Sequence, residues 1–168
     1  YTQNESTIFR SVEFINNRIY TGSFEDFGYW EENENGQLTY FSLAKDLSDE
    51  VLNNDEIWSI VEKDGNIYFH SFGSIYCYNG ETTTRLEKNG SFMFLHKIGN
   101  EVYPQAINGG LFWLKNGALQ AIPNSGFLAD EEVKSIIELD EGTILIGTTR
   151  GLYTFDGSTF RDWNGEER

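Results

Sequence analysis

The sequence predicts an all-β fold in which one short antiparallel meander is repeated along the chain. The clearest copy covers residues 133–160, where apolar runs alternate with Asp-Glu-Gly, Thr-Thr-Arg-Gly and Asp-Gly-Ser, which are turn compositions. Ile136, Ile144 and Leu152 mark three strands at intervals of eight residues. This is the spacing of strands of ordinary length joined by tight loops.

The same meander recurs upstream, and the period of the repeat predicts the architecture. Residues 59–69 align with 135–146 with one residue fewer in the turn, and residues 74–80 align with 151–157. The second strands, marked by Ile19, Ile67, Val102 and Ile144, stand 48, 35 and 42 residues apart. A four-stranded propeller blade needs roughly 40 to 45 residues. The sequence therefore predicts four four-stranded antiparallel blades of a β-propeller.

The expected repeats occupy residues 8–43, 55–86, 92–122 and 133–163 of one propeller segment, 1–168. In the third repeat, Pro104 is expected to interrupt the second strand, because proline cannot donate in the middle of a ladder. The longest connection, 44–56, can hold a short helical turn capped by Ser48. No regular helix is expected elsewhere.

Two segments also resemble a known family. Residues 136–152 read as an apolar pair, Asp-Glu-Gly-Thr, an apolar triplet, Gly-Thr and Gly-Leu, which closely resembles the regulator-propeller repeat of bacterial two-component sensors. That family usually has Trp inside the triplet, where this chain has Leu145. Residues 19–30 are similar to the opening blade of such propellers.

This resemblance implies a larger ring, of which four blades would be a part. It also implies a periplasmic, ligand-sensing module of a hybrid histidine kinase or a membrane-bound transcriptional regulator. The output region would then lie beyond the present chain.

Composition excludes several classes of function. The net charge of -15, from 27 acidic and 12 basic residues, argues against contact with nucleic acid or with an anionic membrane surface. No apolar run approaches the ~18 residues of a membrane span. The single cysteine, Cys77, excludes an internal disulfide framework and a multi-cysteine zinc site.

No metal site or cofactor is predicted. The turns at Asp64, Asp140 and Asp156 lack the alternating oxygen ligands of a calcium loop, and hairpin geometry explains them. No glycine-rich phosphate loop precedes a helix.

In a radial array of blades, the loops from second to third strand and the connections between blades emerge on one face. These loops combine aromatic, carboxylate and amide groups, the mixture that stacks on sugar rings and hydrogen-bonds hydroxyls. The candidate ligand-binding residues are Phe24, Glu25, Asp26, His70, Phe72, Asn108 and Arg150. The alternative is that such residues serve only as turn formers, or, for Arg150, as one partner of a surface salt bridge.

Three functions remain open from the sequence. The first is a non-catalytic sensor that binds a small molecule, with an oligosaccharide as the candidate ligand. The second is a propeller lyase or hydrolase with His70 as base, although no Ser-His-Asp order or paired-His spacing surrounds His70 or His96, so no catalytic residue is assigned. The third is a protein-interaction scaffold. The open sheet edges of such an arc also predict a protein partner, either the remaining blades of a parent chain or a second protomer.

Overall fold

The computed structural model describes residues 8–45, 47, 52, 54–86 and 91–165. The predicted Ser48 turn and the connection at 87–90 lie outside these residues. The chain divides into two compact units, Tyr1–Glu87 and Lys88–Arg168, here called the N-terminal and C-terminal units. Each unit contains two of the expected repeats and is described by itself.

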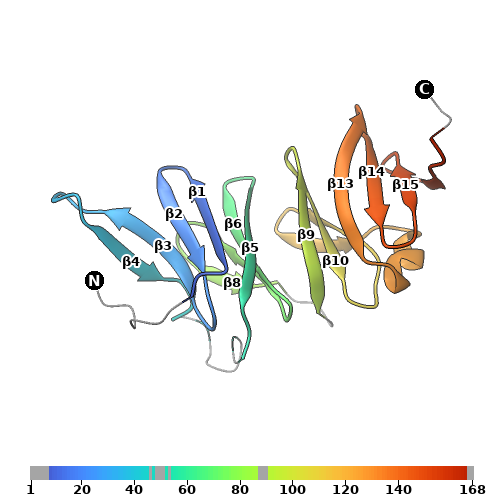
Figure 1. Cartoon of the computed structure of the whole chain (residues 1–168). Coiled ribbons are helices and arrows are strands. Elements are labelled where there is room, and N and C mark those ends of the chain that lie inside the picture. The colour runs from blue at the N-terminus through green and yellow to red at the C-terminus, as the bar shows by residue number, and fades with distance from the viewer. Residues whose placement is uncertain (1–7, 46, 48–51, 53, 87–90, 166–168) are drawn as a thin grey trace. The chain divides into compact units, whose positions relative to one another are not determined.

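The N-terminal unit consists of two four-stranded antiparallel sheets, each with its strands in sequence order (Figure 1). Blade 1 comprises β1 (Ser11–Ile15), β2 (Arg18–Gly22), β3 (Phe27–Glu32) and β4 (Leu38–Ser42). Blade 2 comprises β5 (Ile57–Lys63), β6 (Asn66–Ser71), β7 (Ile75–Tyr78) and β8 (Thr83–Arg85). The first strand therefore begins at Ser11, three residues later than expected.

The C-terminal unit contains blade 4, another four-stranded sheet, and blade 3, which is divided. Blade 3 comprises β9 (Phe92–Ile98), β10 (Glu101–Ala106), β11 (Phe112–Lys115) and β12 (Ala118–Ala121). Blade 4 comprises β13 (Val133–Asp140), β14 (Thr143–Thr148), β15 (Leu152–Phe155) and β16 (Phe160–Asp162). In blade 3 the two hairpins are joined by a single bridge between Gln105 and Leu111. The all-β blade fold is confirmed, with this departure in the third repeat.

Pro104 does not interrupt its strand, and this expectation was wrong. β10 continues through Pro104, which pairs with Leu95 of β9. The Ala106 N–H donates to the Gly110 carbonyl, on the side of β11, at 3.2 Å. Alternate residues of a strand direct their N–H groups to the same edge, so the nitrogen of Pro104 also faces β11. The missing donor therefore limits pairing with β11 and leaves the pairing with β9 intact.

The hairpin turns have the backbone conformation that their sequences predict. Asn16 and Asn17 have φ of 49° and 64°, and Asp64 and Gly65 have φ of 52° and 80°. Two successive positive φ values match the type I′ turn, whose twist suits a two-residue hairpin. These turns fix the register of β1 with β2 and of β5 with β6.

One element was not expected, a short 3₁₀ helix, η1 (Ser125–Asp130), in the connection between β12 and β13. Leu128 in this helix is fully buried in the core of the C-terminal unit. The Ser125 hydroxyl donates to the Ile122 carbonyl at 2.8 Å and accepts the Leu111 N–H at 3.1 Å. Six residues are too few for helical periodicity to show in a sequence, so tertiary contacts determine this helix.

Each unit has its own core, formed where its two blades face each other. In the N-terminal unit, Tyr20 and Phe27 of blade 1 pack with Ile60 and Phe69 of blade 2. Phe27 lies 4.4 Å from Phe69, between ring centroids. In the C-terminal unit the corresponding core joins Tyr103, Leu111, Val133, Ile136, Ile144, Ile146 and Phe155.

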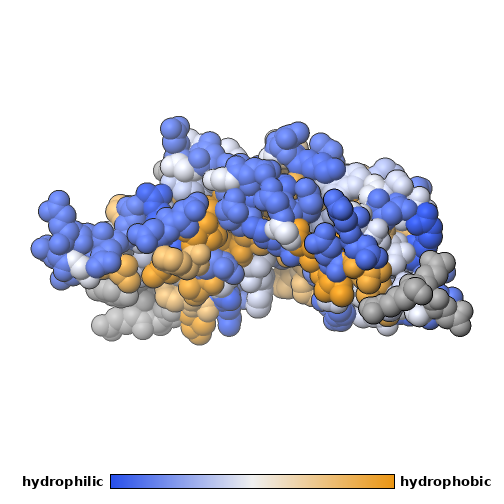
Figure 2. All heavy atoms as spheres, turned by 90° about the horizontal axis from the view of Figure 1, so that it is seen from above, coloured by the Kyte–Doolittle hydropathy of each residue, from blue (hydrophilic) through white to orange (hydrophobic). Residues whose placement is uncertain are grey.

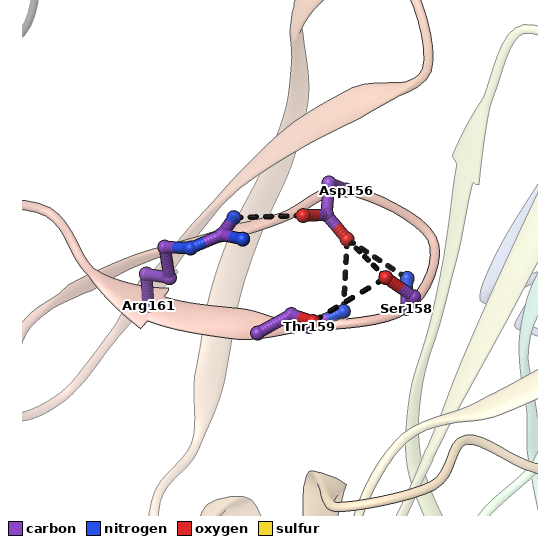
Figure 3. A network of polar contacts seen from close by, with 4 residues as sticks. All are labelled: Asp156, Ser158, Thr159 and Arg161. Carbon is purple, nitrogen blue, oxygen red and sulfur yellow. Dashed lines mark hydrogen bonds and ion pairs between the residues drawn. The ribbon is translucent and has the colours of Figure 1, made fainter.

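The turn between β15 and β16 is organised by one carboxylate, that of Asp156 (Figure 3). Its Oδ1 accepts the Thr159 N–H at 2.8 Å, the Ser158 N–H at 3.0 Å and the Ser158 hydroxyl at 2.8 Å. Its Oδ2 pairs with the Arg161 guanidinium at 2.7 Å. The hydrogen bonds from Ser158 and the charge of Arg161 lower the pKa of Asp156 well below its usual range. Blade 2 builds the equivalent turn with an amide, since Asn79 Oδ1 accepts the N–H groups of Glu81 and Thr82.

We expect Asp156→Asn to keep the turn but remove its acid sensitivity. Because the pKa is lowered in the folded state, ionised Asp156 contributes stability above its unfolded pKa of about 3.9, and this contribution falls as pH drops below that value. Melting temperatures measured between pH 7 and pH 2.5 should therefore show a small loss for the variant at pH 7 and a smaller difference from the wild type at pH 2.5, because the contribution is lost fully only below the folded-state pKa. Asp156→Ala, which removes all four contacts, should be lower throughout. Parallel wild-type and Asp156→Asn profiles would contradict this assignment.

Candidate functional site

The loops from second to third strand share one hydrogen-bonding device in blades 1, 2 and 4. Ser71 and Thr148 end the second strands of their blades and Ser23 directly follows β2. Each of the three donates its backbone N–H to the carbonyl three residues later, at 2.9 Å in all three blades. The hydroxyls of Ser23 and Ser71 donate to the same carbonyl, and the Thr148 hydroxyl lies 3.1 Å from its equivalent. The loop is thereby closed from within, and the two residues that follow the Ser or Thr are left to point outward.

In blade 1 the two predicted carboxylates are used to build the structure. Asp26 accepts the Tyr40 hydroxyl at 3.0 Å and the Ser42 hydroxyl at 2.6 Å. Desolvation, with the nearby Asp26 charge, raises the pKa of Tyr40. Glu25, at φ 55°, accepts the Asn54 N–H at 2.6 Å. Both residues therefore hold the loop in place.

Phe24 and Phe72 are exposed, and the structure adds a third ring, Trp58. Trp58 and Phe72 lie 5.3 Å apart between centroids, and the Arg10 guanidinium lies 5.7 Å from the Trp58 centroid. Arg10 is held there by an ion pair with Glu56 at 3.0 Å. This aromatic platform, formed by Trp58 and Phe72, is suited to stacking on a flat apolar face.

Sequence reasoning missed Trp58 because an aromatic residue in a first strand is expected to pack between blades. The structure has a β-bulge there, since Ile57 pairs with Ser71 and Ser59 with His70, leaving Trp58 unpaired. A bulge redirects a side chain from the regular alternation of a strand. Blades 3 and 4 skip Met93 and Lys134 at the same position.

His70 is only 2% exposed, so its ring is not open to solvent. Its Nδ1 lies 3.2 Å from the Ser59 hydroxyl, and its ring meets Phe72 edge-on at 6.4 Å. These contacts place His70 beneath the platform, where it supports Phe72.

The other two predicted residues, Asn108 and Arg150, are brought together by the C-terminal unit. They line one cavity of about 460 Å³, formed by the loops after β10 and β14 and by the end of the connection that contains η1. The remaining lining residues are Met93, Gln105, Ala106, Ala129, Asp130, Glu131, Glu132 and Thr149.

The floor of this cavity is fixed by Gln105, a buried side chain that links blade 3 to blade 4. Its Nε2 donates to the Glu131 carbonyl at 2.6 Å, and its Oε1 accepts the Val133 N–H at 2.9 Å. Thr149 completes the frame by donating its N–H to the Glu132 carbonyl at 3.0 Å. Hydrogen bonds to the backbone of residues 131–133 therefore hold the polar rim of the cavity in place.

The charged groups of the cavity differ in how far they are engaged. Glu131 accepts the hydroxyls of Thr148 at 2.5 Å and Tyr153 at 3.0 Å, and Glu132 pairs with Lys134. Desolvation and the Glu131 carboxylate raise the pKa of Tyr153. Within the part of the chain that the structure describes, the guanidinium of Arg150 makes no ion pair or side-chain hydrogen bond. The salt-bridge alternative for Arg150 is thus without a partner among those residues.

Comparison with solved structures supports the propeller fold. The extracellular domain of BT4673 from B. thetaiotaomicron, described as a hybrid two-component system, is similar with a TM-score of 0.63 and 19% identity, over 96% of this chain and 23% of that one. Virginiamycin B lyase from Staphylococcus aureus has a TM-score of 0.63 and 10% identity, over 99% of this chain and 59% of that one. The computationally designed Ika4 protein has a TM-score of 0.60 and 15% identity, over 97% and 94% of the two chains.

These likenesses show the fold alone, because all three identities are low. The chain spans less than a quarter of the length of the BT4673 domain that it matches. No protein-family model matches the sequence, and no curated protein matches it at a significant level. In the described residues, the structure contains no helix of the length and apolar character that a bilayer crossing requires.

Replacing Gln105 by Leu should destabilise the C-terminal unit by about 2 kcal/mol, because the buried Val133 N–H and Glu131 carbonyl would lose their partner. Urea denaturation would measure this loss. Gln120→Leu, at an exposed position of β12, is the matched control and should change the free energy of unfolding by less than about 0.5 kcal/mol. Equal effects of the two substitutions would show that Gln105 does not clamp the two blades.

Proposed function

We propose that this chain is the ligand-binding part of a signal-sensing propeller, and that it is non-catalytic. The observation that carries the proposal is the cavity in which Arg150 and Asn108 converge. Both residues are exposed, both come from second-to-third-strand loops, and Arg150 has no ion-pair partner among the described residues although acidic residues outnumber basic ones by 27 to 12.

The ligand that this cavity suits best is a neutral, hydroxyl-rich molecule such as an oligosaccharide. The Asp130 carboxylate, and that of Glu132 beside its ion pair with Lys134, can accept hydrogen bonds from hydroxyls, while Arg150 and the Asn108 amide can donate. An acid-rich lining opposes an anionic ligand, because like charges at short range repel. In the N-terminal unit, the platform of Trp58 and Phe72 offers the stacking surface that sugar rings use.

A role in signalling is supported by the likeness to the BT4673 extracellular domain and by the regulator-propeller motif in residues 136–152. We propose that the chain acts outside the cytoplasm and passes its signal to a kinase or DNA-binding region. The lyase alternative has only the fold in its favour, and His70 lies buried beneath Phe72.

A panel of neutral and uronic oligosaccharides, screened by thermal shift and followed by calorimetry, tests the proposal. A ligand that binds only the folded state raises the melting temperature by mass action. We expect a neutral oligosaccharide to bind, and Arg150→Gln to weaken it about tenfold to a hundredfold, the value of one charge-assisted hydrogen bond. The stability of the unliganded variant should be unchanged, because Arg150 makes no described ion pair.

Arg161→Gln is the matched control, since it removes one positive charge from the same unit, and Arg161 lies in β16, outside the lining of this cavity. Equal weakening by both substitutions would indicate a general charge effect and contradict the site. Conversion of any oligosaccharide in the panel would contradict the non-catalytic assignment.

A further inference from the structure

The register of the sheets makes positions in different blades equivalent, and two blade faces can be compared on that basis. Gly22, Gln105 and Gly147 each pair with the residue that begins or precedes the third strand, which is Phe27, Leu111 or Leu152. Two residues before them come Tyr20, Tyr103 and Leu145. These six residues define what we call the forward face of blades 1, 3 and 4. In blades 1 and 3 it is the face that packs against the next blade of the same unit.

Each unit contains one contact between two blades, and in both contacts the forward-face residues of the first blade are buried. Phe27 and Tyr20 of blade 1 are buried against blade 2, and Leu111 and Tyr103 of blade 3 are buried against blade 4. The equivalent residue of blade 4, Leu152, is 41% exposed. On the same face of blade 4, Ile137 of β13 pairs with Leu145 and is 52% exposed.

The opposite face, here called the rear face, shows the same pattern in reverse. Ile60 of blade 2 and Ile136 of blade 4 are buried against the blade that precedes them. The equivalent residue of blade 1 is Val12, which pairs with Thr21 and is 59% exposed. Phe14, two residues further along β1, is 68% exposed.

The rear face of blade 1 is also hollowed. A cavity of about 460 Å³ lies there, and its lining includes Phe14, Ile19, Trp30 and Leu38. Exposed apolar side chains form patches among the hydrophilic ones on the surface of the molecule (Figure 2). Large exposed apolar patches in soluble proteins mark interaction sites.

We infer that the forward face of blade 4 binds the rear face of blade 1 in a second copy of this chain. The two faces continue the contact that the chain already makes twice, between blades 1 and 2 and between blades 3 and 4. In this contact, blade 4 has the role that blade 1 has in the N-terminal unit. Its residues equivalent to Phe27, Tyr20 and Glu13 are Leu152, Leu145 and Ile137. Val12 and Ile19 of the second copy are equivalent to Ile60 and Ile67 of blade 2.

The smallest assembly that this contact produces is a dimer, which is the state expected at micromolar concentration. The contact is head-to-tail, and such contacts either close into a ring or continue as a filament.

Light scattering during gel filtration at micromolar concentration tests this inference. The wild-type chain should have twice the mass of 19.3 kDa. Two double variants, Ile137→Glu with Leu152→Glu and Val12→Glu with Phe14→Glu, should each be monomeric, since each lacks one of the two faces that form the contact. Phe24→Glu, at an equally exposed loop residue outside both faces, is the matched control and should stay dimeric. Circular dichroism would check that all variants are folded.

Mixing the two double variants distinguishes a head-to-tail contact from any other. One intact forward face and one intact rear face are then present, so a dimer with a single contact should re-form. A monomeric wild-type chain would overturn the inference, and would be the result if a further blade of a longer chain covers these faces. Dimeric double variants, or a mixture that stays monomeric, would overturn it as well.

Discussion

Every blade of this protein is a sheet with apolar side chains on both faces, and no such sheet can be stable alone. Burial of these rows is therefore the constraint from which the rest follows, because about 25 cal/mol is gained for each Å² of apolar surface removed from water. Blade 1 satisfies it on one face by packing Phe27 against Phe69 of blade 2. The approach is so close that a Cβ on Gly22 would lie 2.4 Å from the Ile57 side chain. Stacking, rather than the stability of any one hairpin, maintains the fold.

The candidate sites arise where the repeat departs from regularity. A position at the end of the second strand carries Gly22 in blade 1, His70 in blade 2, Gln105 in blade 3 and Gly147 in blade 4. Glycine only permits close packing, whereas Gln105 uses both ends of its amide to fix the connection that forms the cavity floor. His70 supports the exposed ring of Phe72. The residue at this one equivalent position therefore decides whether a blade only packs closely or also supports a candidate binding surface.

Four of the predicted site residues fall into two groups: those engaged by neighbouring hydrogen-bond donors and those that line a cavity. Asp26 and Glu25 were chosen as loop carboxylates, yet neighbouring hydroxyl and N–H groups engage them, so they serve the loop itself. Asn108 and Arg150 were chosen on the same grounds and instead line a cavity. Loop composition is the same in both cases. Only the position of partner groups from other segments distinguishes a structural side chain from one open to a ligand.

The sequence by itself determined the all-β class, the four-strand period and the turns, because these depend on local properties: alternating apolar residues, and Asn, Asp or Gly where φ must be positive. The tertiary structure alone decided that β10 passes through Pro104, that residues 125–130 form a helix, and that Trp58 points outward at a bulge. Each of these depends on which edge or side chain a distant strand presents. A single sequence carries no such record, because contacts between segments far apart along the chain leave no periodic signal.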